Sequence, residues 1–186
     1  MRSMKVWAVA AALLAAGAAC KRSEEPAPPP PQLGGAPALP PPAMGANAPS
    51  REIPTLEALV VQDPKNRNAW VQLGNDYFDS HQPQKAIDAY GKALELQPND
   101  PNVLTDQGVM YREVGAYDKA LANFEKANQL DASHVTSLFN QGVVWAYDKK
   151  DKAKAIAIWK RVVQQDPNGP NGTKAREAMA ELEAKK

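Results

Sequence analysis

Apolar residues recur every three or four positions from Glu52 to Lys186, a spacing that gives a helix one apolar face. The pattern predicts a series of amphipathic helices, and therefore an all-α fold. Proline lacks a backbone N–H donor, so we expect helices to end near Pro64, Pro98 and Pro167. A short amphipathic unit cannot bury its apolar face alone, so neighbouring units are expected to stack.

The pattern also repeats along the chain. Gly74, Gly108 and Gly142 are 34 residues apart, and each is followed three residues later by an aromatic side chain and then by a lysine–alanine pair. Self-similarity at a fixed period is typical of a solenoid. These positions resemble the tetratricopeptide repeat family, whose unit is a helix, a turn and a second helix. The likeness implies a helix-turn-helix solenoid of about 3.5 repeats.

The resemblance places a half repeat at 52–66, full repeats at 67–100, 101–134 and 135–169, and a capping helix at 171–186, all within a repeat domain at 51–186. The second and third repeats depart from the family at Gln107 and Gln141, and the third has one extra residue in its turn, within Tyr147–Lys154. Structural roles are implied for the signature positions, which are Trp70, Leu73, Gly74, Tyr77, Ala86, Tyr90, Ala93, Pro98, Gly108, Tyr111, Ala120, Phe124, Ala127, Gly142, Trp145, Ala155, Trp159 and Pro167.

In this family the first helix of each repeat lines a concave face. Its amides and aromatic rings would suit an extended peptide or a partner helix. The predicted lining is Asn68, Val71, Gln72, Asn75, Phe78 and Asp79, then Asn102, Thr105, Asp106, Val109, Arg112 and Glu113, then Thr136, Phe139, Asn140, Val143, Ala146 and Tyr147. The alternative is that Phe78, Phe139 and Tyr147 only pack against the neighbouring hairpin.

One family subclass grips the C-terminal carboxylate of a peptide with lysines, an arginine and asparagines. The corresponding positions here are Val71, Asn75, Asp106, Thr136 and Asn140, of which Asn75 alone matches, and Asp106 would repel a carboxylate. We therefore do not expect such a clamp. The acidic residues around Arg112 favour a neutral or basic segment; they are Asp79, Asp106 and Glu113.

The N-terminus has the pattern of an export signal. Arg2 and Lys5 precede fourteen uncharged residues at 6–19, too few to span a bilayer, and Cys20 follows. This resembles a bacterial lipoprotein signal, which implies cleavage after residue 19 and lipidation of Cys20, although Gly17 stands where the family has leucine. The alternative is ordinary secretion, with an Ala16–Ala18 cleavage site and Cys20 as a free thiol.

Residues 21–50 are dominated by proline, alanine and glycine, and ten of the seventeen prolines lie between Pro26 and Pro49. Such a composition favours extended polyproline II. We expect 20–50 to be a disordered tether between a membrane and the domain, or alternatively a polyproline ligand for an aromatic groove.

Composition argues against several function classes. The net charge of +1 is unlike that of a nucleic-acid binder, and a single cysteine and two distant histidines do not suggest a metal site. His81 and His134 have no nucleophile pattern near them, so neither a catalytic residue nor a cofactor is expected. We expect the lysines at 149, 150, 152 and 154 to lie in a solvated turn.

The expected function is that of a protein-binding scaffold in the bacterial cell envelope, on the periplasmic side of a membrane. An alternative comes from the stretch Leu59–Gly91, which resembles periplasmic repeat proteins of cytochrome c maturation that hold apocytochrome. A soluble periplasmic or secreted protein, and an enzyme whose site is assembled by the fold, remain further alternatives.

Overall fold

The computed structural model describes residues 52–184, which belong to the second of two compact units of the chain. The predicted signal peptide at 1–19, Cys20 and the tether at 20–50 lie outside the described residues. The helices are α1 (Ile53–Gln62), α2 (Arg67–Asp79), α3 (Pro83–Leu96), α4 (Pro101–Glu113), α5 (Tyr117–Leu130), α6 (Val135–Val143), α7 (Lys152–Gln165) and α8 (Pro170–Ala184), with a π-helical turn, η1 (Val144–Asp148), after α6.

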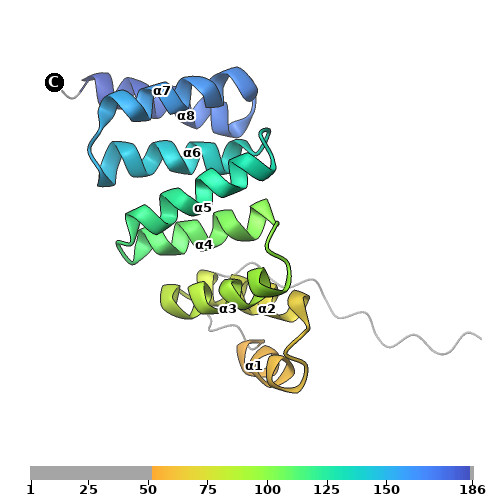
Figure 1. The fold of residues 1–186 in the computed structure, drawn as a ribbon. Coiled ribbons are helices and arrows are strands. Elements are labelled where there is room, and N and C mark those ends of the chain that lie inside the picture. The colour runs from red at the N-terminus through yellow and green to blue at the C-terminus, as the bar shows by residue number, and fades with distance from the viewer. Residues whose placement is uncertain (1–51, 185–186) are drawn as a thin grey trace, which may run out of the picture. The chain divides into compact units, whose positions relative to one another are not determined.

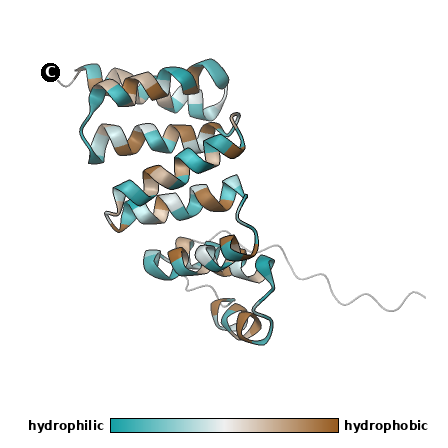
Figure 2. Cartoon of the chain, in the orientation of Figure 1, coloured by the Kyte–Doolittle hydropathy of each residue, from teal (hydrophilic) through white to brown (hydrophobic). Residues whose placement is uncertain are grey.

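The helices stack in chain order, each against the next, as in a solenoid (Figure 1). The pairs α2–α3 and α4–α5 are the first two hairpins, and α6 with η1 and α7 is the third. Apolar and polar residues alternate around each helix (Figure 2). The all-α solenoid predicted from the sequence is therefore confirmed. Helices α1, α3 and α7 end two residues before Pro64, Pro98 and Pro167, as expected.

The repeated glycines determine how closely the two helices of a hairpin approach. A Cβ atom at Gly74 would lie 2.5 Å from the Tyr90 ring, and one at Gly108 would lie 2.6 Å from the Phe124 ring. Gly142, the third of these glycines, faces the indole ring of Trp159. Each ring is at most 1% exposed. The glycine thus makes room for a large ring from the second helix of the same hairpin.

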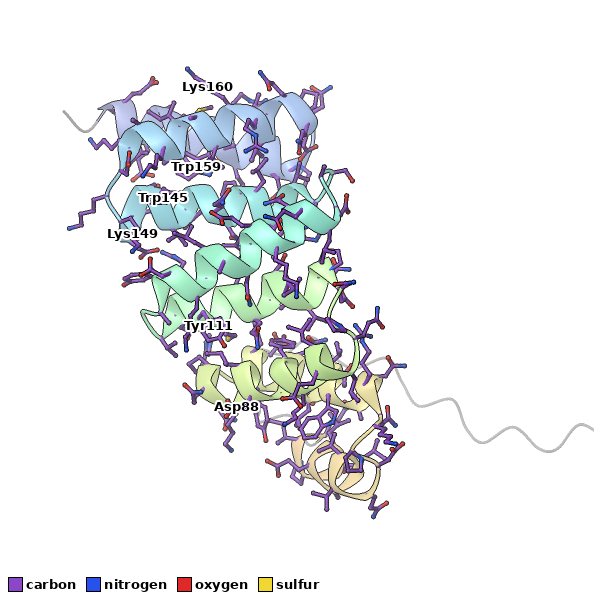
Figure 3. The ribbon with its side chains drawn as sticks, in the orientation of Figure 1. Asp88, Tyr111, Trp145, Lys149, Trp159 and Lys160 are labelled. Carbon is purple, nitrogen blue, oxygen red and sulfur yellow. The ribbon has the colours of Figure 1, made fainter. Side chains whose placement is uncertain are left out.

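A second contact recurs with the same period. A lysine in the first turn of the second helix places its ammonium group over the aromatic ring that follows the glycine: Lys85 over Tyr77 at 5.1 Å, Lys119 over Tyr111 at 5.4 Å, and Lys154 over Trp145 at 4.1 Å. Figure 3 labels the second and third of these rings. Such cation–π contacts are worth about 0.5–1 kcal/mol at exposed sites, so they supplement the buried rings.

The departures at Gln107 and Gln141 have a physical explanation. The buried Gln107 amide donates to the Ile87 carbonyl at 3.0 Å and accepts from Asn123 at 2.8 Å. Gln141 donates to Glu125 at 3.3 Å. Both glutamines therefore connect one hairpin to the preceding one through hydrogen bonds, where Leu73 uses apolar burial.

The extra residue of the third repeat lies before the turn. The N–H groups of Gln82 and Ala116 donate to the carbonyls five residues earlier, whereas that of Asp151 donates to Trp145, six residues earlier. The left-handed turn residue keeps its place in all three repeats, at His81, Gly115 and Lys150. Sequence reasoning put the insertion in the turn; η1 instead absorbs it at the end of the helix, as π-turns do.

We expect Gly108→Ala to lower the free energy of unfolding by about 1–3 kcal/mol, the usual cost of overpacking a core. The higher helix propensity of alanine alone would raise the free energy of unfolding by up to about 1 kcal/mol. The sign of the measured change therefore separates overpacking from helix propensity. Urea denaturation measures the change. The matched control is Gly91→Ala, whose Cβ would lie 3.5 Å from the Gln107 amide, an ordinary contact. Unchanged or higher stability in Gly108→Ala would contradict the glycine–ring account.

Candidate functional site

The predicted concave lining divides by burial. We call the first-helix residues named above the groove face. Those half-buried or exposed are Asn68, Val71, Gln72, Asn75, Phe78, Asp79, Asn102, Asp106, Val109, Arg112, Glu113, Thr136, Phe139, Asn140, Val143 and Tyr147. Thr105 and Ala146 differ from the expectation: they are 3% and 6% exposed, and the Thr105 hydroxyl donates to the Pro101 carbonyl at 2.7 Å. Neither side chain offers a surface to a partner.

A cavity of about 330 Å³ opens in the groove face. It is lined by Asn75, Phe78 and Asp79 from α2, Tyr90 from α3, and Asp106 from α4. Four of these five residues were predicted to line the binding face. The sequence predicted only a structural role for Tyr90. Its hydroxyl group was not predicted to contribute to the cavity.

The polar groups of the cavity are held in place by the hairpin core. The Tyr90 hydroxyl donates to Asn75 Oδ1 at 2.8 Å, although the Tyr90 residue is 1% exposed. This bond occupies the amide oxygen and leaves the Asn75 NH2 group as a donor. A fixed amide donor beside an open cavity can bind a backbone carbonyl of an extended segment.

The electrostatics of the cavity are acidic. Burial, followed by the charge of Asp100, raises the pKa of Asp106 to about 6. Burial also raises the pKa of Tyr90, with smaller contributions from Asp106 and Asp79. Asp100 is itself paired with Arg67, so Asp79 and Asp106 are the carboxylates that face the cavity.

The third repeat contributes less to the groove face than expected. Phe139 stacks on Trp159 with ring centroids 6.0 Å apart, and Tyr147 lies tilted against the same indole at 6.3 Å. Arg112 is not an open cation, because its guanidinium pairs with Asp148 of η1. Phe139 and Tyr147 therefore pack against a ring of their own hairpin, not of the neighbouring one, and both keep part of their surface exposed.

The histidines have structural positions. His134 caps α6 by accepting from the Ser137 N–H at 3.3 Å, and its other ring nitrogen lies 3.0 Å from Asn102 Oδ1 of α4. Ser137 is fully buried and its hydroxyl donates to the His134 carbonyl, so it is inaccessible as a nucleophile. His81 is exposed in the first turn at a φ of 54°.

Two features of the described residues bear on other site types. Over 52–184, no group of three or more His, Cys, Asp or Glu side chains is placed to hold a metal ion. Within the same range, no helix combines the length and apolarity needed to cross a bilayer.

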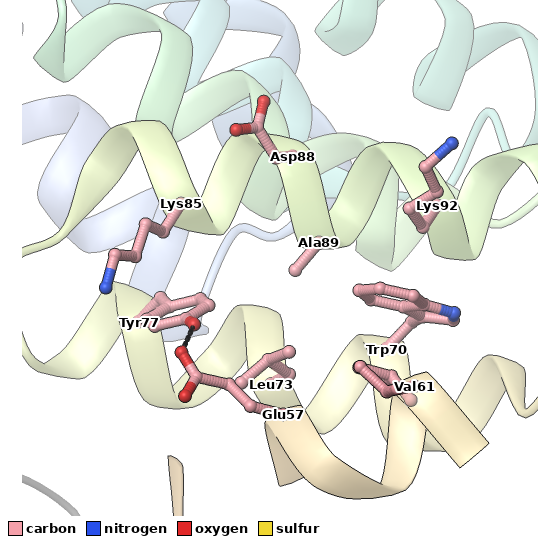
Figure 4. Close-up of a pocket in the computed structure, with 10 residues that line it drawn as sticks. Glu57, Val61, Trp70, Leu73, Tyr77, Lys85, Asp88, Ala89 and Lys92 are labelled. Carbon is pink, nitrogen blue, oxygen red and sulfur yellow. Dashed lines mark hydrogen bonds between the residues drawn. The ribbon is translucent and has the colours of Figure 1, made fainter. Parts of the chain in front are cut away.

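A second cavity, of about 370 Å³, lies among α1, α2 and α3 (Figure 4). Its floor includes Leu73 and Ala89, and Trp70 and Tyr77 flank it. The Tyr77 hydroxyl donates to Glu57; burial, and then this bond, raise the pKa of Tyr77 to about 12. The sequence does not predict this cavity, because Trp70 and Tyr77 are signature positions with expected structural roles. No sequence pattern marks where α1 of the half repeat leaves a cavity beside them.

Comparison with known proteins gives consistent results. Three models described as tetratricopeptide repeat match residues 68–100, 89–122 and 106–170, which together span more than half of the chain. The chain is 25% identical over 122 residues to Hsp70-Hsp90 organizing protein 2 of Arabidopsis thaliana, and 31% identical over 118 residues to the cytochrome c-type biogenesis protein CycH of Pseudomonas aeruginosa. These alignments cover 66% and 61% of this chain but only 21% and 28% of the relatives.

A solved structure shares the fold. The first TPR of Spaghetti (RPAP3), bound to the HSP90 peptide SRMEEVD, superposes with a TM-score of 0.58 at 21% sequence identity, covering 66% of this chain and 94% of that one. At this identity the likeness concerns the fold alone.

The raised pKa of Asp106 predicts a pH-dependent stability. Because the folded state holds this proton more tightly than the unfolded chain does, ionised Asp106 destabilises the fold, and the penalty grows from about pH 4 to a plateau above about pH 6. We expect Asp106→Asn to raise the free energy of unfolding by about 1–2 kcal/mol at pH 7.5 and by much less at pH 4, a range reduced for partial exposure.

Urea denaturation of both proteins from pH 4 to pH 8 measures this difference. Asp88→Asn, which makes the same change at an exposed position of α3, is the control and should show little pH-dependent gain. A difference between Asp106→Asn and wild type that stays constant with pH would contradict the assignment.

Proposed function

The chain belongs to the tetratricopeptide repeat family, and from this premise we propose that its repeat domain is a protein-interaction scaffold that binds an extended peptide or a partner helix on the groove face. The observation that carries the proposal is the cavity in which α2, α3 and α4 bring together a ring, an amide and two carboxylates. Support also comes from the relative of the same fold that holds a peptide.

The role is that of an adaptor, not of an enzyme. His134, which contacts Ser137, is used to cap α6, and Ser137 is buried. The polar groups of the groove cavity are the kinds that bind backbone and side chains of a partner. We place no catalytic residue and no cofactor in this domain.

The location proposed for the scaffold is the periplasmic side of a bacterial membrane. Its support is the sequence of the N-terminus: a charged start, a short apolar run and a cysteine after small residues. Lipidation of Cys20 would anchor the chain, and the segment at 21–50 would hold the repeats away from the bilayer. The scaffold would then serve an envelope complex.

A second candidate function is help in cytochrome c maturation, by holding an unfolded apocytochrome. The observation that favours it is the 31% identity to CycH, a cytochrome c-type biogenesis protein. An extended, unfolded chain is also the kind of ligand that a groove with a fixed amide donor suits.

Site-specific photocrosslinking tests the scaffold proposal. A photoreactive phenylalanine analogue at Asn68 or Gln72, both exposed on α2, should capture the same protein from envelope membranes, because both positions belong to the groove face and lie outside the lining of the cavity. The matched control positions are Asp88 on α3 and Gln129 on α5, which should not capture it. A c-type apocytochrome as the captured protein would select the second candidate, and equal capture from all four positions would contradict the groove face.

Metabolic labelling with a palmitate analogue tests the anchor. The wild-type chain should incorporate the label and fractionate with membranes, whereas Cys20→Ser should lose the label and the membrane association, because the chain has a single cysteine. Cys20→Ala serves as a second variant with the same expectation. A soluble, unlabelled wild-type chain cleaved after Ala18 would instead support ordinary secretion.

A further inference from the structure

The groove cavity is chemically unlike the rest of the groove face. The residue after each repeated glycine is Asn75 in the first repeat but Val109 and Val143 in the next two. The ring opposite that position carries a hydroxyl group only in the first repeat, at Tyr90. The position after the glycine, and the ring opposite it, therefore carry this amide–hydroxyl pair only in the first repeat.

The charges around this cavity do not balance internally. Arg67 pairs with Asp100, and Arg112 pairs with Asp148, so each arginine of α2 and α4 is already matched by a carboxylate. Among the described residues, neither Asp79 nor Asp106 has an ion-pair partner. A cation from outside would offset the cost of partly burying the Asp106 carboxylate near the charge of Asp100.

The cavity also has an apolar side, which narrows the kind of cation that fits. The Phe78 ring is half-buried and packs against the core cluster of the first hairpin, so one wall of the cavity is aromatic. A long aliphatic stem that ends in a positive charge matches both a ring and a carboxylate pair, whereas a small inorganic cation would leave the ring exposed to water.

We propose that this cavity is a subsite for a lysine or arginine side chain of the bound segment. The stem packs on Phe78, the cationic head pairs with Asp79 and Asp106, and the Asn75 amide donates to a backbone carbonyl of the same segment. This inference rests on the proposed function and specifies the partner: a segment with a basic residue at this point. An acidic segment, such as the SRMEEVD peptide of the solved relative, would be repelled here.

The test uses the full-length protein and four pools of peptides of about nine residues, randomised except for a central lysine, arginine, norleucine or glutamate. Norleucine keeps the aliphatic stem of lysine and lacks its charge. We expect the lysine and arginine pools to bind about tenfold more tightly than the norleucine pool, in fluorescence polarisation, and the glutamate pool to bind most weakly.

Three Asp→Asn variants and the NMR spectrum of the wild-type protein locate the binding site. Asp79→Asn and Asp106→Asn should each remove most of the preference for the basic pools, while Asp88→Asn, outside the groove face, should leave it unchanged. Circular dichroism verifies that each variant is folded. Chemical-shift changes at Asn75 and Phe78 of the wild-type protein on adding the lysine pool test the same site without any substitution.

The outcomes distinguish the two proposals. Equal binding of the basic and norleucine pools, with shifts on the groove face, would overturn the basic subsite and leave the scaffold function standing. Binding of the basic pools that Asp88→Asn weakens as much as Asp106→Asn does would overturn the placement in this cavity. Binding of no pool would overturn both the groove face as a peptide site and the subsite within it.

Discussion

The distance between the two helices of each hairpin depends on one contact, in which a glycine of the first helix faces a buried aromatic ring of the second. A Cβ atom at Gly74 or Gly108 would enter the ring opposite it, so the backbone can approach only where no side chain stands. Close-packed interiors do not absorb such an intrusion without moving a helix. Because each hairpin also stacks on the next, an error at Gly108 would reach both neighbours.

The same contact prepares the binding surface. The ring opposite Gly74 is a tyrosine, and its hydroxyl reaches across to the amide of Asn75, the next residue along α2. The core of the hairpin therefore positions a groove donor through a single hydrogen bond. In the second repeat the ring is Phe124 and the neighbouring residue is Val109, so packing is retained and the polar link is absent. The same helix pairing thus presents an amide at this position in the first repeat and a valine at the equivalent position in the second.

The period of 34 residues and the prolines made the helices predictable, because both act locally on the backbone. The face occupied by Asn75, Phe78, Asp79 and Asp106 also followed from the register. What could not be read from the sequence depends on partners far apart in the chain. The pairing of Arg112 with Asp148, the stacking of Phe139 on Trp159 and the place of the extra residue in η1 all require three-dimensional positions.

The Asp106 carboxylate of the groove cavity lowers the stability of the free domain, whereas in the proposed subsite it would favour binding. The half-buried Asp106, whose pKa is raised to about 6, destabilises the isolated fold at neutral pH, and an asparagine of the same shape would avoid that cost. Tyr90, almost fully buried in the hairpin core, lines the same cavity as Asp106. A residue that lowers the free energy of unfolding and is not needed for packing is typical of a ligand site. The ligand that would offset the charge of Asp106 is a cation.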